Sequence, residues 1–383
     1  MARIYLDHNA TTPLDARVRA AMVAALDLAG NPSSVHEEGR RARDAVERAR
    51  RQVAALVGGD AEEVIFTSGG TEADLLGVAG LFRAARARGA PARVLAPRIE
   101  HPAVLGGISH LAGAHGAEPV WLQVDAAGRV DLGDLERALG AGGAAVVAIA
   151  LANHELGTLQ EVAAAAALCA RAGALLHVDA VQAAGRVAID VRALGADALA
   201  LSAHKMYGPT GAGALWVRRG IDVAPLLGGG HQERERRPGT ENVAGLVGLG
   251  AAAELAAVEL DARRTHVTEV GAALEAGLAA LPGATVHAAG APRVPGTINA
   301  RFAGAPGELV VQALDLCGVA ASTGAACTSG TVTASPVLLA LGLPRAQALE
   351  GVRFSSGRGT TLAQIQAVLE MLPDILARIR AYS

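Results

Sequence analysis

We predict an α/β fold, with a large domain built on a mostly parallel central sheet and a smaller C-terminal α+β domain. Two features of the sequence predict it: short apolar runs alternate with helical patterns through the first two thirds of the chain, and this alternation stops after Asn242. The composition agrees, because 383 residues with 51% hydrophobic and 19% charged side chains supply a large core and a charged surface.

Seven apolar runs have the length of buried strands, and stretches rich in Ala, Arg and Glu with helical spacing separate several of them. This alternation is typical of strand–helix–strand units in a parallel sheet. We expect strands at 64–67, 93–96, 119–122, 145–151, 175–178, 198–201 and 214–217, and helices at 40–56, 75–88 and 162–172. We assign residues 14–250 to the large domain, and we expect ligands to bind where its strands end.

Beyond Asn242 the pattern becomes one long helical stretch over 243–280. It is followed by strands expected at 297–302 and 352–354 and helices expected at 308–316 and 362–381. We assign residues 251–383, together with 1–13, to a small domain.

The charge of the chain argues against nucleic acid or a membrane as a partner. The formal net charge is −3, and the arginine pairs at 40–41 and 50–51 lie among acidic residues, as on a solvated helix face. No apolar stretch is long enough to span a membrane, and the start of the chain has no signal-peptide core, so we expect a cytoplasmic protein. The three cysteines form no CxxC pair, so neither disulfides nor a metal site are expected.

Lysine is the most informative residue type in this chain. Lysine and arginine together number 34, and only one of them, Lys205, is a lysine. Arginine replaces lysine readily on a solvated surface, but it cannot form a Schiff base, because that bond needs a primary amine that loses its proton. The alternative is that Lys205 has been retained by chance, but the residues around it argue against this.

Polar residues follow the two strands nearest to Lys205 in the sequence. Ser202 and His204 come directly after the strand at 198–201, where their side chains would donate hydrogen bonds to a phosphate. Asp179 and Gln182 come after the strand at 175–178. A carboxylate there either pairs with a pyridinium nitrogen or only caps a helix.

Two further clusters follow other strands. Gly70 and Thr71 open a helix after the strand at 64–67, where backbone N–H groups bind phosphate, although a plain strand–helix turn is the alternative. His101 follows the strand at 93–96 and would stack on a cofactor ring and move protons, unless its role is structural.

Of the three cysteines, Cys327 is the candidate for chemistry. It lies between small residues in Ala-Ala-Cys-Thr-Ser-Gly, a context typical of an accessible loop. Cys169 and Cys317 lie in apolar surroundings and are expected to be buried.

These motifs together resemble the cysteine desulfurases of the nitrogen-fixation and iron–sulfur cluster assembly type, within the class V aminotransferases. The resemblance covers nearly the whole chain, and the motifs occur in the order that the family has. The matching segments are 5–13, 30–34, 66–72, 100–104, 152–155, 177–182, 202–213, 229–234, 239–242, 295–299, 326–330 and 352–355.

The resemblance implies a fold type I transferase dependent on pyridoxal 5′-phosphate (PLP), usually a homodimer. Lys205 would hold PLP as a Schiff base, Asp179 would pair with its ring nitrogen, Gln182 would lie near its hydroxyl, and His101 would stack on its ring. The phosphate would be held by Gly70, Thr71, Ser202 and His204, and Thr240 would reach the phosphate bound by the partner subunit.

The resemblance also implies the substrate and the product. Asn153, beside the cofactor, and Arg353 would bind the carboxylate of L-cysteine. Lys205, His101 and Cys327 would be catalytic, giving L-alanine and a Cys327 persulfide that passes to an acceptor protein. The acceptor stays open, as do a related class V enzyme, such as a selenocysteine lyase, aminotransferase or epimerase, and a degenerate, non-enzymatic member.

The chain departs from the family pattern at three places. His8 and His154 stand where the family usually has asparagine. After Cys327 the family usually has a segment similar to Leu-Glu-Pro-Ser-His, whereas this chain has Val-Thr-Ala-Ser-Pro at 332–336. We expect these differences to alter the surroundings of the cofactor and the choice of acceptor, not the chemistry.

Overall fold

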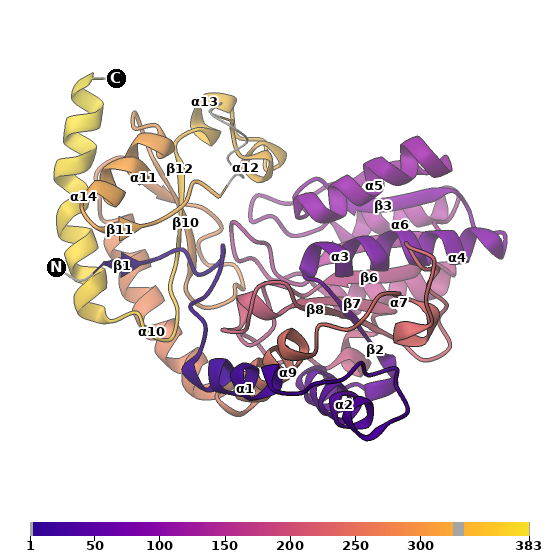
Figure 1. Cartoon of the computed structure of the whole chain (residues 1–383). Helices are drawn as coiled ribbons and strands as arrows, with labels where there is room; N and C mark the ends of the chain where they lie inside the picture. The colour runs from indigo at the N-terminus through magenta and orange to yellow at the C-terminus, as the bar shows by residue number, and fades with distance from the viewer. Residues whose placement is uncertain (1–2, 325–332, 383) are drawn as a thin grey trace.

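The computed structural model of the chain describes residues 3–324 and 333–382. A seven-stranded sheet with helices on both faces lies at one side of the molecule, and two small sheets with their own helices lie at the other (Figure 1). The predicted α/β class and the mostly parallel central sheet are confirmed. The proposed division into residues 14–250 and the rest stays a prediction.

The central sheet has the strand order β2-β8-β7-β6-β5-β3-β4. Its strands are β2 (Val64–Thr67), β3 (Arg93–Pro97), β4 (Glu118–Leu122), β5 (Val146–Ala150), β6 (Leu175–Asp179), β7 (Ala198–Ser202) and β8 (Gly213–Val217). Only β8 runs antiparallel to its neighbours β2 and β7. All seven lie within a residue of the apolar runs in the sequence, because a strand buried on both faces is apolar throughout.

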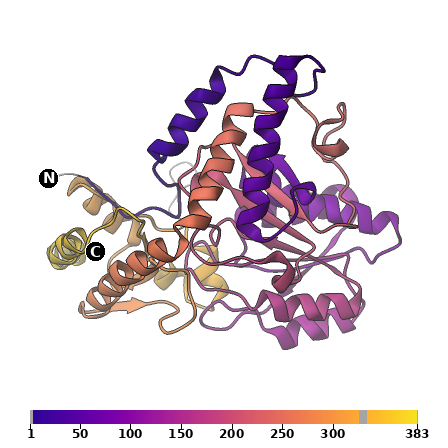
Figure 2. The same cartoon turned by 90° about the horizontal axis from the view of Figure 1, so that it is seen from below.

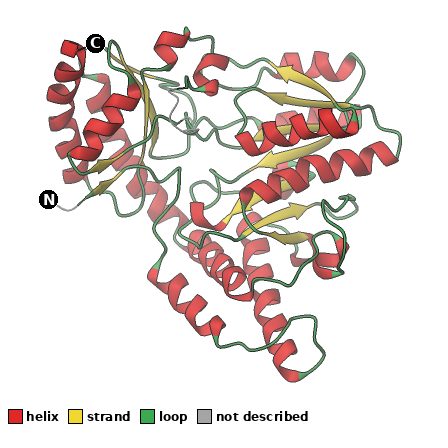
Figure 3. Cartoon of the chain, turned by 45° about the horizontal axis from the view of Figure 1, so that its top comes forward, coloured by secondary structure: helices red, strands yellow, loops and turns green. Residues whose placement is uncertain are grey.

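Helices cover both faces of this sheet (Figure 3). Alternate residues of each strand point to opposite faces, so Val178 packs into one apolar cluster and Ala148 into another. The first cluster includes α1 (Ala16–Leu26), α2 (Glu37–Val57), α6 (Leu132–Gly140), α7 (Val162–Ala172), α8 (Val191–Leu194) and α9 (Val243–Val258). The second includes α3 (Gly70–Leu75), the π-turn Leu76–Gly80, α4 (Leu81–Ala87) and α5 (Pro102–His115).

A buried polar pair fixes how closely the π-turn approaches the sheet. His177 of β6 is fully buried, and its Nε2 lies 3.0 Å from Oδ1 of Asp74 in α3. A β-carbon on Gly77 would stand only 2.3 Å from the His177 ring. Glycine at position 77 therefore lets the helix reach the ring, and with it the strand that ends at Asp179.

The predicted long helix over 243–280 is wrong in one respect, because it is broken. α9 ends at Val258 and α10 (Leu260–Ala279) leaves at 73° to it, with Glu259 between them. The Glu259 carboxylate accepts hydrogen bonds from Arg17 and from Arg263. The break thus lies where the distant α1 contacts the chain, which the local sequence does not reveal.

The second region contains two small sheets. In the first, β10 (Thr297–Phe302) pairs antiparallel with β9 (Ala284–Val286) and with β12 (Gly351–Ser355). In the second, β1 (Ile4–Tyr5) pairs parallel with β11 (Val319–Ala320). The helices are α11 (Gly307–Leu316), α12 (Pro336–Ala340), α13 (Arg345–Ala348) and α14 (Leu362–Tyr382).

The segment after β1 runs from this second region toward the central sheet, and α10 crosses the same gap (Figure 2). The backbone of Leu6 accepts a hydrogen bond from Ser355, whereas the backbone of Thr12 donates one to His204, next to β7. Residues 6–12 therefore lie between the two parts of the molecule, beside the end of β7.

No single helix in the parts of the chain that the structure describes is long and apolar enough to cross a membrane. The pair α9 and α10 has the required length and composition only when its two bent members are taken together.

Candidate active site

The site forms at the carboxyl edge of the central sheet. β6 ends at Asp179 and its parallel neighbour β7 ends at Ser202, with Asp179 paired to Ala200. Lys205 follows β7 in the 3₁₀ turn Ala203–Lys205. Both strands therefore deliver their polar ends to the same edge, as expected for parallel strands.

Lys205 is held by the segment between the two parts of the molecule. Its Nζ donates to the backbone oxygens of Asn9 and of Ala10, the latter at 2.8 Å. Burial, together with the charges of Arg353 and Arg186, lowers the pKa of Lys205 to about 8. The amine is therefore easier to deprotonate than an ordinary lysine, as a Schiff-base lysine requires.

Asp179 and His101 lie close enough to Lys205 to influence each other's charge. Burial raises the pKa of Asp179, while the charges of His101 and Lys205 oppose that rise. His101 caps α5, and its Nδ1 accepts a hydrogen bond from the backbone of Ala103 at 3.1 Å. Since that nitrogen is an acceptor and burial lowers the pKa of His101, the ring is neutral with its proton on Nε2.

The candidate phosphate residues converge on the same edge. A β-carbon on Gly70 would lie 2.9 Å from Val181 and 3.3 Å from Ser202, so the start of α3 meets the ends of β6 and β7. Thr71 is exposed at the start of α3. His204 binds Thr11 Oγ1 through Nδ1 at 3.1 Å, and burial lowers its pKa to about 4.

Two buried polar atoms at this edge have no partner among the described residues. They are Oγ of Ser202 and Oε1 of Gln182, whose Nε2 donates to the backbone of Asn9. A hydroxyl that donates to a phosphate and an amide oxygen that accepts from a ring hydroxyl would satisfy both. Together with Lys205 and Asp179, these two unpaired atoms fit PLP.

Arg353 and Asn153 lie beside this edge with most of their hydrogen bonds already made. Arg353, on β12, donates to the backbone of His154 at 2.9 Å and to Asp7 at 2.8 Å, which leaves its buried Nε without a partner in the described chain. The Asn153 amide binds only backbone atoms, donating to Ile99 and accepting from residues 155 and 156. Asn153 therefore shapes the wall of the site, whereas the Nε of Arg353 remains a free donor.

The predictions for Thr240 and for the three cysteines have different outcomes. Thr240 is exposed in the single chain and comes just before Asn242, which caps α9. Cys327 lies outside the described residues. Cys169 is buried, as expected, but the expectation that Cys317 is buried is wrong: it follows the last turn of α11 and is exposed.

The sequence reasoning missed three residues that organise the site. The backbone oxygen of Asn9 accepts from both Lys205 and Gln182. Glu100 is buried beside His101, and burial raises its pKa well above the usual range. The sequence did contain a signal for Glu100, because it is a charged residue next to the candidate histidine His101. No local sequence feature indicates that Asn9 belongs to the site.

Glu155 is the third such residue, and it touches both ends of the undescribed segment. It is fully buried, Ser335 Oγ donates to its Oε2 at 2.6 Å, and a β-carbon on Gly324 would lie 2.8 Å from that oxygen. Burial raises its pKa to about 7. Next to it, the His154 ring packs edge-on against His101, with 5.3 Å between ring centres.

A lysine beside a buried carboxylate, with candidate phosphate-binding residues at the ends of parallel strands, is the arrangement expected of a PLP enzyme of fold type I. The family model for aminotransferase class-V matches residues 4–368, and the chain belongs to this family. Within it, the chain is 43% identical to a protein named cysteine desulfurase from Trichormus azollae, covering 100% of this chain and 95% of that protein.

Solved structures agree with this membership. A NifS-like protein superposes with a TM-score of 0.90 at 32% identity and covers 98% of this chain and 100% of its own. A structure described as SspA in complex with cysteine has a TM-score of 0.80 at 28% identity, with 94% of this chain and 100% of that one covered. The predicted resemblance to cysteine desulfurases is thereby confirmed.

Proposed function

We propose that this chain is a PLP-dependent cysteine desulfurase, which converts L-cysteine to L-alanine and carries the sulfur as a persulfide on Cys327. One observation carries the proposal: the only lysine of the chain lies at the strand ends, where the charges of Asp179 and Arg353 act on its amine. The similarity to cysteine desulfurases over the whole length supports it, as does the neighbour described with cysteine.

PLP, when bound, supplies an aldehyde carbon that joins an amine and a ring that accepts the electron pair of a broken bond. Lys205 would hold it, Asp179 would keep its ring nitrogen protonated, and Gln182 and Ser202 would satisfy its hydroxyl and phosphate. Gly70, Thr71 and His204 complete the phosphate cradle, and Thr240 would complete that of a partner subunit in a homodimer.

Each residue of the site then has a separate role in the reaction. Arg353 orients the substrate carboxylate through its free Nε, and Asn153 holds the neighbouring wall. The Lys205 amine, once free and neutral, takes the α-proton, and neutral His101 donates or receives a proton through Nε2. The Cys327 thiolate attacks the substrate sulfur, the carbon–sulfur bond breaks, and protonation of the carbon gives alanine.

The sulfur on Cys327 then passes to a second thiol or to an acceptor protein. The identity of this acceptor stays open. The overall balance is L-cysteine plus enzyme thiol giving L-alanine plus enzyme persulfide. The cytoplasmic location and the absence of a nucleic-acid partner remain predictions from the sequence.

The proposal predicts matched products. The purified, PLP-loaded protein incubated with L-cysteine and a thiol reductant should release alanine and sulfide in equal amounts, because each turnover yields one of each. Chromatography of alanine and a colorimetric sulfide assay on the same samples measure this. Alanine without sulfide, or neither product from PLP-loaded protein, would contradict the proposal.

Arg353 provides a test of the substrate contact. Arg353→Gln should raise KM for L-cysteine by about 50-fold with a smaller effect on kcat, because a buried charge-assisted hydrogen bond to the carboxylate is lost. Arg353→Lys should be intermediate, since it keeps the charge but not the planar fork. The exposed Arg345 gives the control, and Arg345→Gln should behave as wild type; an unchanged KM in folded Arg353→Gln would remove Arg353 from the site.

A further inference from the structure

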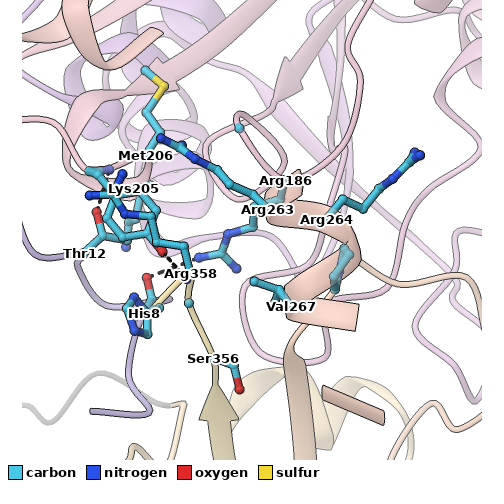
Figure 4. A pocket seen from close by; sticks show the side chains of 14 residues that line it. His8, Thr12, Arg186, Lys205, Met206, Arg263, Arg264, Val267, Ser356 and Arg358 are labelled. Atoms are coloured by element: carbon cyan, nitrogen blue, oxygen red, sulfur yellow. Dashed lines mark hydrogen bonds between the residues drawn. The ribbon is translucent and has the colours of Figure 1, made fainter. Parts of the chain in front are cut away.

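A small cavity lies behind Lys205, between the two parts of the molecule (Figure 4). Its volume is about 30 Å³, enough for a monatomic ion or about one to two waters. Segments far apart in the sequence line it, among them residues 8 and 12, the loop at 185–186, α10 and the turn at 356–358. It belongs to none of the contacts proposed above for PLP or L-cysteine, although Lys205 forms part of its wall.

Three residues that line this cavity each have a buried polar atom without a partner among the described residues. These atoms belong to His8 (Nδ1), Arg263 (Nη1) and Ser356 (Oγ), and each of these residues is at least nine-tenths buried. Arg263 Nη1 can only donate, and the hydroxyl and the imidazole can donate as well, so a ligand that accepts hydrogen bonds would satisfy all three.

The charges around the cavity are of one sign. Its lining contains Arg186, Arg263, Arg264, Arg358 and Lys205, and contains neither aspartate nor glutamate. Figure 4 shows three of these arginines converging from different segments, whereas Arg264 extends away from them. Around Tyr207, the guanidinium carbons of Arg263 and Arg358 lie 5.1 and 4.3 Å from the ring centre, so both cations contact the same ring.

Carboxylates near the cavity only partly offset these cations. Arg263 pairs with Glu259, and Arg358 pairs with Asp15 and more distantly with Glu259, but Arg17 pairs with both carboxylates as well. Arg186 donates only to neutral groups, namely the Asn9 and Thr297 side chains and the His8 backbone. Arg186 is a partly buried cation with no carboxylate partner among the described residues, which is costly, and a bound anion would lower that cost.

We propose that this cavity binds a halide-sized inorganic anion, for which chloride is the probe, through His8, Arg263 and Ser356. A water molecule would satisfy the three donors less well, because it brings two further hydrogens into a wall of cations. His8 is one of the positions where the chain departs from the family, and a β-carbon on Gly357 would lie within 2.6 Å of its ring. The glycine therefore lets the imidazole lie beside Ser356 at the cavity.

Anion exchange tests this proposal on the PLP-loaded protein. Replacing sodium gluconate by sodium chloride at constant ionic strength should raise the thermal unfolding midpoint by about 2 °C, and the rise should saturate, because only the folded state holds the ion. Gluconate is too large for the cavity. Ser356→Ala, which removes one donor with little other change, should weaken the chloride response several-fold, and Arg263→Gln should abolish it.

Arg345→Gln is the control, since Arg345 is exposed and lies outside the lining of the cavity. This variant should keep the wild-type response. Crystals soaked in bromide should show an anomalous peak between His8, Arg263 and Ser356. Equal midpoints in gluconate and chloride, or no bromide peak in the cavity, would overturn the proposal and leave the cavity to water.

Discussion

Lys205→Ala should abolish the formation of alanine from L-cysteine, with a loss of at least about 10⁴-fold, because one residue supplies both the covalent tether and the base. No other lysine exists in the chain to substitute for it. Alanine measured by chromatography gives the rate, and the visible absorbance of the purified protein reports how PLP is held.

The fold should survive this substitution. The amine binds only two backbone oxygens, and its removal relieves repulsion from Arg353 and Arg186. Lys205→Arg is the informative companion: it restores the charge but not the removable proton, and it should be as inactive as the alanine variant. Near-normal alanine formation by either folded variant would show that Lys205 is not the Schiff-base residue.

Cys327→Ala should still bind PLP and L-cysteine but should form no persulfide and release almost no sulfide. The mass of the peptide that contains residue 327 measures this, since wild type treated with L-cysteine should gain one sulfur atom there. The expected fall in sulfide release is about 10³-fold or more, because without the thiolate nothing attacks the substrate sulfur.

Cys317 supplies the control for this experiment. It is the exposed thiol among the described residues, and it therefore competes with Cys327 as a possible sulfur carrier. Cys317→Ala should leave sulfide release unchanged. If Cys317→Ala and not Cys327→Ala lost the activity, the sulfur would be carried at the end of α11.

Much of the central sheet could be predicted because its strands, apart from the edge strand β4, are mostly buried on both faces and largely apolar. The polar residues at and after the ends of β6 and β7 could be predicted as a site because parallel strands end at one edge of the sheet. Strands β1, β9 and β11 could not be predicted: they have two or three residues each, too few for a pattern, and depend on partners elsewhere in the chain.

The missed and mistaken residues share a cause in contacts over long separations. The predicted helix is broken at Glu259, which binds Arg17 of the distant α1, and Asn9 joins the site through its backbone, which carries no side-chain signal. Cys317 follows an apolar helix, and only the packing of α11 shows that this end of the helix faces outward. The resemblance to a family predicted which residues form the site. The contacts in the structure show which of their atoms have no hydrogen-bond partner among the described residues.

The pairing of β1 with β11 can form only late in the synthesis of the chain. Ile4 is made more than 300 residues before its partner Val319, and Leu6 more than 300 residues before the Ser355 amide that binds it. The strands of the central sheet, which end at Val217, are all synthesised before then. Asn9, which donates its backbone N–H to Ser355 Oγ, also depends on the late-made strand β12, so we expect the surroundings of Lys205 to be completed only after the central sheet.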